Sequence, residues 1–556
     1  MYHKYFGKKL TDLLFEKGLI TERQLQEAIV EQRKTGEKLV KLLVKAGLVS
    51  QIDIINLLEK ELGISQANIP LTVAATVLSK LPEPMVRRHR VFPVRIENNA
   101  LVVAMTDPLN PLIIDELQQQ TKMEIRPEIA TEEQIDAAIA RHFEVAKLEQ
   151  EMMVYERQTN TYGHPKAEDN STLVRLVNSI IKQGIDGRAS DIHIEPGPEY
   201  VLVRQRVDGM LREMMHLPLS SHSAIISRIK IMANMDIAEK RLPQDGRAGL
   251  EHGNSTVDLR VSVIPAVFGE KAVIRILKKD RQLMNISRLG FSKENFEIFK
   301  TLTLSTSGII LATGPTGSGK NTTLYAVLHG LNSPEKNIIT IEDPVEYTIK
   351  GITQVQVNSK VGLTFALGLR SILRQDPDII MVGEIRDKET AEIAVRAATT
   401  GHLVISTMHT KDAADAVYRL IDLGVSPFLV ASSLLGVVAQ RLVRKICPHC
   451  REASNSQQGE QVQLLLPELT RKSGNFFRGR GCSYCDHTGY YGRTGIHEIL
   501  VPDRQIKELI VRGVSAGTLK KAAEQKGMVT LQKDAIHKVA EGLTTIEEVK
   551  RVLYTV

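Results

Sequence analysis

The sequence contains no tryptophan, and only 4% of its 556 residues are aromatic. Proteins that bind single-stranded nucleic acid stack bases on aromatic side chains, so this scarcity argues against such a role. The net charge of +7 is spread over the whole chain and is only a weak bias towards anionic partners. We therefore expect no nucleic-acid partner.

Long apolar runs are also absent. No stretch approaches the ~18 apolar residues that a membrane-spanning helix needs. The first residues, Met1 to Lys9, lack the apolar segment of a secretory signal peptide. Hydrophobic residues make up 42% and charged residues 25% of the chain, as in globular proteins. We expect a folded cytoplasmic protein whose contact with a membrane is peripheral.

Cysteine is scarce, and its spacing is informative. The four cysteines form two C-x-x-C pairs, Cys447/Cys450 and Cys482/Cys485. Two such pairs predict a tetrahedral thiolate zinc site in which the segment between the pairs is an inserted loop. A redox pair or free thiols are the alternatives. Because four thiolates leave no position open for water, we expect this Zn²⁺ to be structural.

The chain is too long for a single hydrophobic core, so we expect several domains. Shifts in composition and periodicity predict the boundaries. The expected parts are a helical repeat module at 1–64, an α+β module at 65–145, a polar linker at 146–169, a sheet-rich domain at 170–287, and a parallel-sheet domain at 288–556 with a tetracysteine insert at about 445–490 and a helical tail.

The helical module rests on an internal repeat. Lys-Gly18-Leu-Ile-Thr21 recurs 29 residues later as Ala-Gly47-Leu-Val-Ser50. Each copy predicts a helix that ends at the glycine and a second helix capped by Thr or Ser. A plain helical bundle would account for this pattern equally well.

Short apolar runs and period-two alternation predict the sheets. Asn98 and Asn99 join two such runs as a hairpin. The expected strands are 91–96, 100–105, 191–195, 201–207, 257–263, 272–277, 309–312, 338–341, 379–382 and 403–407, and helices are expected from 111, 131 and 171, at 225–235 and beyond 503, the last with a capping box Thr544-x-x-Glu547.

A glycine-rich turn between an apolar strand and a helix predicts a phosphate-binding loop. Its backbone amides would converge on phosphate oxygens, and its lysine would add a positive charge for the β- and γ-phosphates. The candidate nucleotide-binding residues are Gly314, Pro315, Thr316, Gly317, Ser318, Gly319, Lys320, Asn321 and Thr322.

One position departs from the usual pattern. A phosphate loop normally has Ser or Thr after the lysine, because that hydroxyl binds Mg²⁺, and here the residue is Asn321. An amide oxygen can bind Mg²⁺ but reaches further than a hydroxyl. Thr322 lies ~100° further round the helix and cannot simply replace the missing group.

Polar residues follow the expected strands at the edge where open α/β sheets bind ligands. Carboxylates there can hold Mg²⁺ or orient the attacking water. The alternative is that they are ordinary acidic residues of loops that follow strands. Two histidines bracket one strand, and both could reach a γ-phosphate at the neighbouring strand tip. The candidates are Glu342, Asp343, Glu346, Glu384, His402 and His409.

Three arginines in the preceding sheet-rich domain, Arg247, Arg260 and Arg275, are candidates to neutralise transition-state charge as an arginine finger. Surface ion pairing is the alternative for each of them.

Four motifs, in this order, resemble the Walker A, Asp box, Walker B and His box of the ATPases of type II secretion and type IV pilus assembly. They are Gly314-Pro-Thr-Gly-Ser-Gly-Lys320, Thr340-Ile-Glu-Asp-Pro-Val-Glu346, Leu373-Arg-Gln-Asp-Pro-Asp378 with Gly383-Glu-Ile-Arg-Asp387, and Thr400-Gly-His402 with Thr407-Met-His-Thr410. The resemblance runs from about residue 171 to the C-terminus, and the tetracysteine insert resembles the extension and secretion branch.

The resemblance implies an α/β multidomain fold: a RecA-like ATPase core with a zinc insert, preceded by an α+β PAS-like domain and by N-terminal helical and α+β modules. It implies a homo-hexamer that binds ATP and Mg²⁺ between the RecA-like and PAS-like domains. Hydrolysis would move one domain against the other, and an inner-membrane platform protein would pass this motion to pilin or pseudopilin subunits. Glu384 and the Asp-box acids would then handle Mg²⁺ and water, and the histidines would contact the γ-phosphate.

The N-terminal repeat resembles a module that binds cyclic di-GMP through paired Arg-Leu-Gly motifs. Here the motif positions hold Lys9-Leu10-Thr11 and Lys38-Leu39-Val40. The guanidinium fork that suits guanine or phosphate is lost, as is the glycine that allows close backbone approach. We expect no cyclic di-GMP binding, which leaves the module free to dock an adaptor protein.

Two other functions compete with a mechanochemical ATPase. Asn321 motivates the first, a nucleotide-binding ring scaffold with weak hydrolysis. The second is a DNA translocase, which the scarcity of aromatic residues disfavours.

Overall fold

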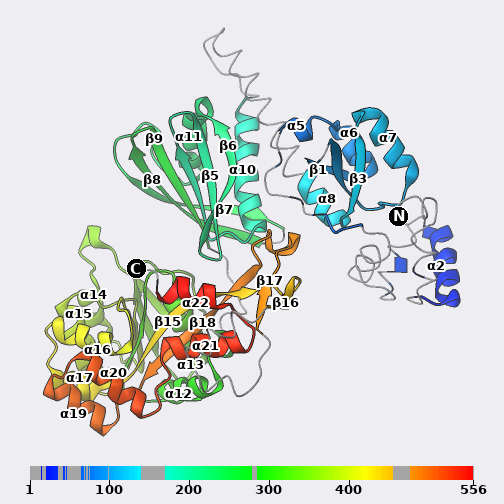
Figure 1. The fold of residues 1–556 in the computed structure, drawn as a ribbon. Coiled ribbons are helices and arrows are strands. Elements are labelled where there is room, and N and C mark those ends of the chain that lie inside the picture. Colours follow the sequence, from blue (N-terminus) through cyan, green and yellow to red (C-terminus); the bar gives the residue numbers. More distant parts are fainter. Residues whose placement is uncertain are drawn as a thin grey trace. The chain divides into compact units, whose positions relative to one another are not determined.

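The computed structural model describes residues 14, 20–35, 42–43, 46, 64–67, 69, 73, 75–97, 99–139, 169–253, 255–277, 285–454 and 476–554. Contacts divide the chain into two compact units (Figure 1). Unit 1 is Met1–Ile276 with Cys482–His487, and unit 2 is Leu277–Gly481 with Thr488–Val556. The predicted linker at 146–169 lies outside the described residues except for its last position. No helix in the described ranges is both long and apolar enough to cross a membrane.

Little of the predicted helical repeat is among the described residues. Helix α2 (Glu22–Thr35) follows Thr21, whose hydroxyl accepts a hydrogen bond from the Gln24 N–H at 3.4 Å while the Gln24 side chain accepts one from the Thr21 N–H at 2.8 Å. This reciprocal cap confirms the predicted start of that helix. Of the second copy only Ala46 is described, and Lys38 to Val40 lie outside the described residues.

A three-stranded sheet forms the next part of unit 1. The predicted hairpin is confirmed: β1 (Val91–Glu97) and β2 (Ala100–Met105) are antiparallel. A third strand, β3 (Glu124–Ile129), which was not expected, pairs with β2 in parallel. The helices around it are α5 (Ala75–Leu78), α6 (Glu83–His89), α7 (Pro111–Thr121) and α8 (Glu132–Ile139).

A six-stranded sheet in the order β6-β5-β4-β9-β8-β7 forms the rest of unit 1. Buried apolar residues of two helices pack against it, including Val177 of α10 and Ile229 of α11. At the β5–β6 turn, Asp208 and Gly209 adopt φ of 49° and 86°, the left-handed geometry of a tight hairpin. The elements are α10 (Asp169–Asp186), β4 (Asp191–Pro196), β5 (Tyr200–Val207), β6 (Met210–Pro218), α11 (His222–Met232), β7 (Gln244–His252), β8 (Ser255–Ala266) and β9 (Gly269–Leu277).

Unit 2 is built on a seven-stranded sheet in the order β12-β11-β13-β14-β10-β15-β18. Every neighbouring pair is parallel except β15 and β18. The predicted parallel-sheet core is confirmed. Its strands are β10 (Gly308–Thr313), β11 (Ile338–Glu342), β12 (Thr353–Gln356), β13 (Ile379–Val382), β14 (Leu403–Met408), β15 (Leu434–Ile446) and β18 (Tyr490–Leu500).

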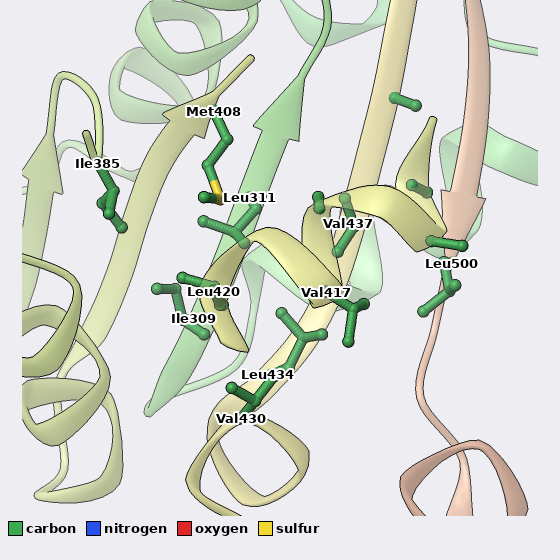
Figure 2. Close-up of a cluster of buried hydrophobic side chains, with 14 of the residues drawn as sticks. Ile309, Leu311, Ile385, Met408, Val417, Leu420, Val430, Leu434, Val437 and Leu500 are labelled. Atoms are coloured by element: carbon green, nitrogen blue, oxygen red, sulfur yellow. The ribbon is translucent and has the colours of Figure 1, made fainter. Parts of the chain in front are cut away.

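Helices cover both faces of this sheet, which is why its strands read as continuous apolar runs. On β10, Ile309 and Leu311 join the larger core, whereas Ile310 and Ala312 join the other. Figure 2 shows part of the larger core, where Leu311 and Met408 lie close together. The helices are α12 (Lys293–Thr303), α13 (Lys320–Leu331), α14 (Phe365–Ile372), α15 (Lys388–Thr399), α16 (Ala413–Asp422), α17 (Pro427–Ser433), α19 (Arg504–Arg512), α20 (Ala516–Gln525), α21 (Leu531–Ala540) and α22 (Ile546–Leu553).

The predicted helical tail is confirmed, but its capping box is displaced by one residue. The Thr545 hydroxyl, not that of Thr544, caps α22 by accepting a hydrogen bond from the Glu548 N–H at 3.3 Å. Thr544 is buried and donates to the Arg444 carbonyl at 2.8 Å, so its hydroxyl is engaged elsewhere.

A small antiparallel pair, β16 (Arg451–Ala453) and β17 (Phe477–Gly479), flanks the gap between the two cysteine pairs. Short 3₁₀ helices complete the described structure at Leu219–Ser221, Ile286–Arg288, Ser359–Val361 and Ser483–Cys485.

Candidate functional site

The predicted phosphate loop connects the carboxyl end of β10 to the first turn of α13. Gly317 and Gly319 have φ of 78° and 91°, in the left-handed region that other residues rarely adopt. A Cβ on Gly319 would lie 2.7 Å from the Gln440 amide nitrogen, so a larger residue would displace that side chain. Pro315, Thr316 and Gly317 are exposed, so the tip of the loop is open to a ligand.

The buried side chains of the loop fit a phosphate chain. The Lys320 ammonium group donates to the carbonyls of Gly314 and Pro315, at 2.7 and 3.1 Å. Burial lowers its pKa to about 8, the nearby Glu384 raises it and Arg441 lowers it. The Ser318 hydroxyl is buried without a hydrogen-bond partner. An anion would supply the charge and the acceptor that these two groups lack.

Asn321 contacts a predicted catalytic acid. Its side-chain amide donates to the Glu346 carboxylate at 3.3 Å, and both residues lie beside the phosphate loop. The amide oxygen is the atom of Asn321 that can bind a cation. Thr322, the third residue of α13, is half-buried.

The three glutamates that were equivalent candidates in the sequence differ in their surroundings. Glu342 is 3% exposed, and its carboxylate accepts hydrogen bonds from the Tyr325 hydroxyl, from Thr340 at 2.6 Å and from Gln354 at 3.1 Å. Glu346 is half-buried, and Asp343 beside it is exposed. The carboxylate of Glu342 is therefore occupied by hydrogen bonds from the protein, whereas that of Glu346 is bonded to Asn321 beside the phosphate loop.

Glu384 follows β13 and lies at the same edge of the sheet. Its carboxylate is 2.5 Å from an Arg386 guanidinium nitrogen and 3.8 Å from the His409 ring. Burial and the charge of Lys320 lower the pKa of His409, which Glu384 partly offsets. The Thr313 hydroxyl accepts from the N–H of Thr410 at 3.0 Å, which holds the loop that carries His409 against the start of the phosphate loop. Glu384 and His409 are thus brought together.

His402 does not join them. β14 pairs with β10 so that Gly308 is opposite Leu403 and Thr313 is opposite Met408. His402 therefore lies at the amino edge of the sheet, about 20 Å of strand from the phosphate loop. Its ring nitrogen contacts the Ala397 carbonyl at 3.0 Å. This placement corrects the expectation that both histidines reach one γ-phosphate, because the length of a six-residue strand separates them.

The three candidate arginines lie on the six-stranded sheet of unit 1. Arg247 on β7 is directly opposite Arg260 on β8. Arg275 on the neighbouring strand β9 is opposite Asp191 and donates to its carboxylate at 2.9 Å. Its side chain is 60% exposed, so this ion pair leaves most of the guanidinium accessible.

The four cysteines form one cluster whose sulfur atoms all lie within 4.8 Å of one another. Cys482 and Cys485 have their sulfurs 3.8 Å apart, the separation of about 3.8 Å expected for two ligands ~2.3 Å from a tetrahedral zinc ion. Backbone N–H groups of Gly481 and Cys482 donate to sulfurs of Cys450 and Cys485, at 3.2 and 3.3 Å. Such donors stabilise thiolates, so this cluster fits a metal site.

Sequence reasoning missed three residues beside the phosphate loop. Tyr325 contacts the Asp-box acids, and Gln440 accepts a hydrogen bond from Thr323 at 2.7 Å. Arg441 donates to the Lys411 carbonyl at 2.7 Å and lies near Gly314. No local motif marks them, because their roles come from contacts between α13 or β15 and distant segments.

Comparison with protein families gives two matches. The family described as "Type II/IV secretion system protein" matches residues 166–551, and the "MshEN domain" matches residues 62–148.

Similar proteins agree with this result. The chain is 47% identical to the type IV pilus assembly ATPase PilB of Thermus thermophilus over 476 residues, which cover 84% of this chain and 54% of that protein. It is 41% identical to the type IV pilus assembly ATPase PilB of Myxococcus xanthus over 97% of this chain and 98% of that protein. The chain thus spans about half the length of the Thermus relative and almost all of the Myxococcus relative.

Among solved structures, the Legionella pneumophila ATPase DotB superposes with a TM-score of 0.50 at 21% identity, covering 68% of this chain and 94% of DotB. At this identity the likeness concerns the fold. Because the family match covers more than half of the chain and the Myxococcus relative is matched along nearly its whole length, this chain belongs to the type II/IV secretion system protein family.

Proposed function

We propose that this protein hydrolyses ATP and uses the energy to move its units relative to each other, driving the assembly of pilin or pseudopilin subunits. The observation that supports the proposal is the gathering of Lys320, Glu346 and Glu384 at the carboxyl edge of a parallel sheet. This is the edge where open α/β sheets bind ligands. The pilus assembly ATPases similar to this chain point in the same direction.

The residues of the loop supply the phosphate contacts. Backbone N–H groups of 316–319, the Ser318 hydroxyl and the Lys320 ammonium group would hold the β- and γ-phosphates, with Pro315 and Thr316 at the open tip. The Asn321 amide oxygen and Glu384 would hold Mg²⁺, directly or through water. Bound Mg²⁺ would neutralise charge on the phosphate oxygens.

Glu346 or Glu384 would take the proton of the attacking water. Attack of that water on the γ-phosphorus would break its bond to the β–γ bridging oxygen and release ADP and phosphate. His409 would contact the γ-phosphate. An arginine of unit 1, among Arg247, Arg260 and Arg275, would neutralise the charge that develops on the leaving group.

We propose further that the protein is a cytoplasmic homo-hexamer at the inner face of the cytoplasmic membrane, where a platform protein receives its motion. The four cysteines would hold a structural Zn²⁺. The N-terminal module would dock an adaptor protein and would not bind cyclic di-GMP.

Asn321 favours a second candidate function, a nucleotide-binding ring scaffold with little hydrolysis. If the Asn321 amide is a poor substitute for the usual hydroxyl, Mg²⁺ would be held loosely and turnover would be slow.

Steady-state ATPase assays decide between the two functions. We expect the unaltered chain to exceed the Lys320→Ala variant clearly, and Asn321→Thr to change turnover by less than about threefold. A rate no higher than that of Lys320→Ala would refute the hydrolase proposal. A gain of a hundredfold or so in Asn321→Thr would instead favour the scaffold.

A further inference from the structure

Tyr325 connects the helix after the phosphate loop to the acidic turn that follows β11. Its side chain is buried in α13, five positions after Lys320. The hydroxyl donates to the Glu342 carboxylate and accepts a hydrogen bond from the Glu346 N–H at 3.1 Å. One hydroxyl therefore holds the turn at both of its ends.

Glu342 is the fixed end of this connection. Thr340 and Gln354 also donate to its carboxylate, and Gln354 donates to the Tyr347 carbonyl at 3.1 Å as well. A buried carboxylate that receives several donors is held tightly in one geometry. Burial and the Glu342 charge both raise the pKa of Tyr325, so the phenol keeps the proton that it donates.

Glu346 is the end that bears on the proposed chemistry. Helix α13 holds this residue at two points: Tyr325 binds its backbone, and Asn321 binds its carboxylate at 3.3 Å. Asn321 and Tyr325 are four residues apart and so lie on the same face of the helix. A shift of α13 would therefore carry Glu346 with it.

We infer that Tyr325 is a positioning residue for hydrolysis: its hydroxyl, anchored on Glu342, keeps the Glu346 carboxylate at the phosphate loop. Glu342 then anchors the Tyr325 hydroxyl and binds neither Mg²⁺ nor the attacking water. This inference rests on the proposed ATPase function. It also separates the three glutamates into one anchor and two residues available to the reaction.

The test removes one oxygen from the full-length chain. Tyr325→Phe keeps the ring and its packing against Tyr347, whose centroid is 4.4 Å away. Tyr347→Phe is a matched control, because the Tyr347 hydroxyl makes no hydrogen bond to any residue that the structure describes. We expect Tyr325→Phe to lower kcat by about ten- to a hundredfold, as for a lost hydrogen bond to a charged group, and to change ADP affinity less than about twofold. Tyr347→Phe should match the unaltered chain in both measurements.

Two further measurements exclude a merely structural role. Glu342→Gln should lose turnover as Tyr325→Phe does, without changing the Mg²⁺ concentration needed for half-maximal activity. Hydrogen exchange should be faster at the Glu346 amide in Tyr325→Phe than in Tyr347→Phe, because that amide loses its acceptor. This readout needs no hydrolysis.

Unchanged kcat in Tyr325→Phe would overturn the inference, as would a parallel loss of ADP binding or a raised Mg²⁺ requirement in Glu342→Gln. If the unaltered chain hydrolyses no more ATP than Lys320→Ala, the proposed function fails. Hydrogen exchange then still decides whether Tyr325 holds the turn: equal exchange in the two tyrosine variants would refute it.

Discussion

Glu342 and Glu346 are four residues apart on one turn, yet their side chains have different environments. The sequence offered both as candidates for metal binding and water activation, since both follow a buried strand. In the structure Glu342 is buried among protein donors, and Glu346 contacts Asn321 beside the phosphate loop. Donors from α13 and β12 distinguish them, since Tyr325 and Gln354 both bond Glu342, and no local spacing encodes those contacts.

His497 on β18 is a second residue whose surroundings were not readable from the sequence. It is fully buried, its ring is stacked on Phe291 with centroids 3.8 Å apart, and neither ring nitrogen has a hydrogen-bond partner. Burial, followed by the charge of Lys538, lowers its pKa well below the usual value of 6.5. The folded protein therefore keeps this histidine neutral.

This depressed pKa predicts that acid weakens unit 2. The unfolded chain takes up a proton near pH 6.5, whereas folded His497 does not. Its contribution to stability is thus present above pH 6.5 and is lost as pH falls, by up to tenfold in the unfolding equilibrium constant per pH unit. We expect denaturant unfolding between pH 7 and 5 to show a shallower pH dependence in His497→Leu than in the unaltered chain. Identical slopes would contradict this role.

At the scale of elements, the sequence predicted best where the pattern was local. β10, β11, β13 and β14 are short apolar runs buried on both faces, and a loop connects β10 to α13 where the glycine spacing predicted one. β7 was missed, because its sequence Gln-Asp-Gly-Arg-Ala-Gly-Leu-Glu-His is polar and contains two glycines. Its partner β8 holds it in the sheet.

The β15–β18 pair was also missed, for a different reason. Val437 pairs with Leu500 and Ile446 with Tyr490, so the two strands are joined across the whole cysteine segment. No turn signal between neighbouring runs marks so distant a partner. The spacing of the cysteines, in contrast, does predict the cluster. In the structure one C-x-x-C pair follows the end of β15 and the other precedes the start of β18.

The cysteine cluster predicts a metal that can be removed. We expect about one zinc ion per purified chain, and close to none in Cys482→Ser, because three thiolates hold zinc far more weakly than four. Elemental analysis measures the metal, and thermal unfolding measures the accompanying loss of stability. Tyr484→Phe, which changes an exposed neighbour, is the control. Full zinc content in Cys482→Ser would show that the cluster is not the binding site.

At the scale of the whole molecule, the proposed reaction needs residues from both units. The predicted phosphate loop belongs to unit 2, whereas the candidate arginines belong to unit 1. The alternative to an arginine finger was surface ion pairing. The structure shows such a pair for Arg275, which is bound to Asp191. An arginine held in this way is oriented before it meets a ligand.

We therefore predict that Arg275→Gln retains nucleotide binding and loses turnover. Its kcat should fall by roughly a thousandfold, the lower end of measured arginine-finger effects, while ADP affinity changes little. Arg204→Gln is the control, because Arg204 lies on the same sheet and pairs with Glu195. Turnover above half of the unaltered rate in Arg275→Gln would assign the finger to Arg247 or Arg260 or exclude it.

The strand β15 runs from the predicted phosphate loop to the cysteine cluster. The strand pairs with β10 up to Thr313 and then runs past Arg441 to Ile446, next to Cys447. Five residues of β15, Leu442 to Ile446, separate Arg441 from the first cysteine, a distance of about 20 Å along the strand, and the pairing with β18 shifts register between Arg444 and Ile446. One continuous strand therefore joins the predicted phosphate loop to the cysteine cluster, and a fluorophore attached near the cysteines tests, by its change in emission, whether nucleotide added at the loop alters this distant end of β15.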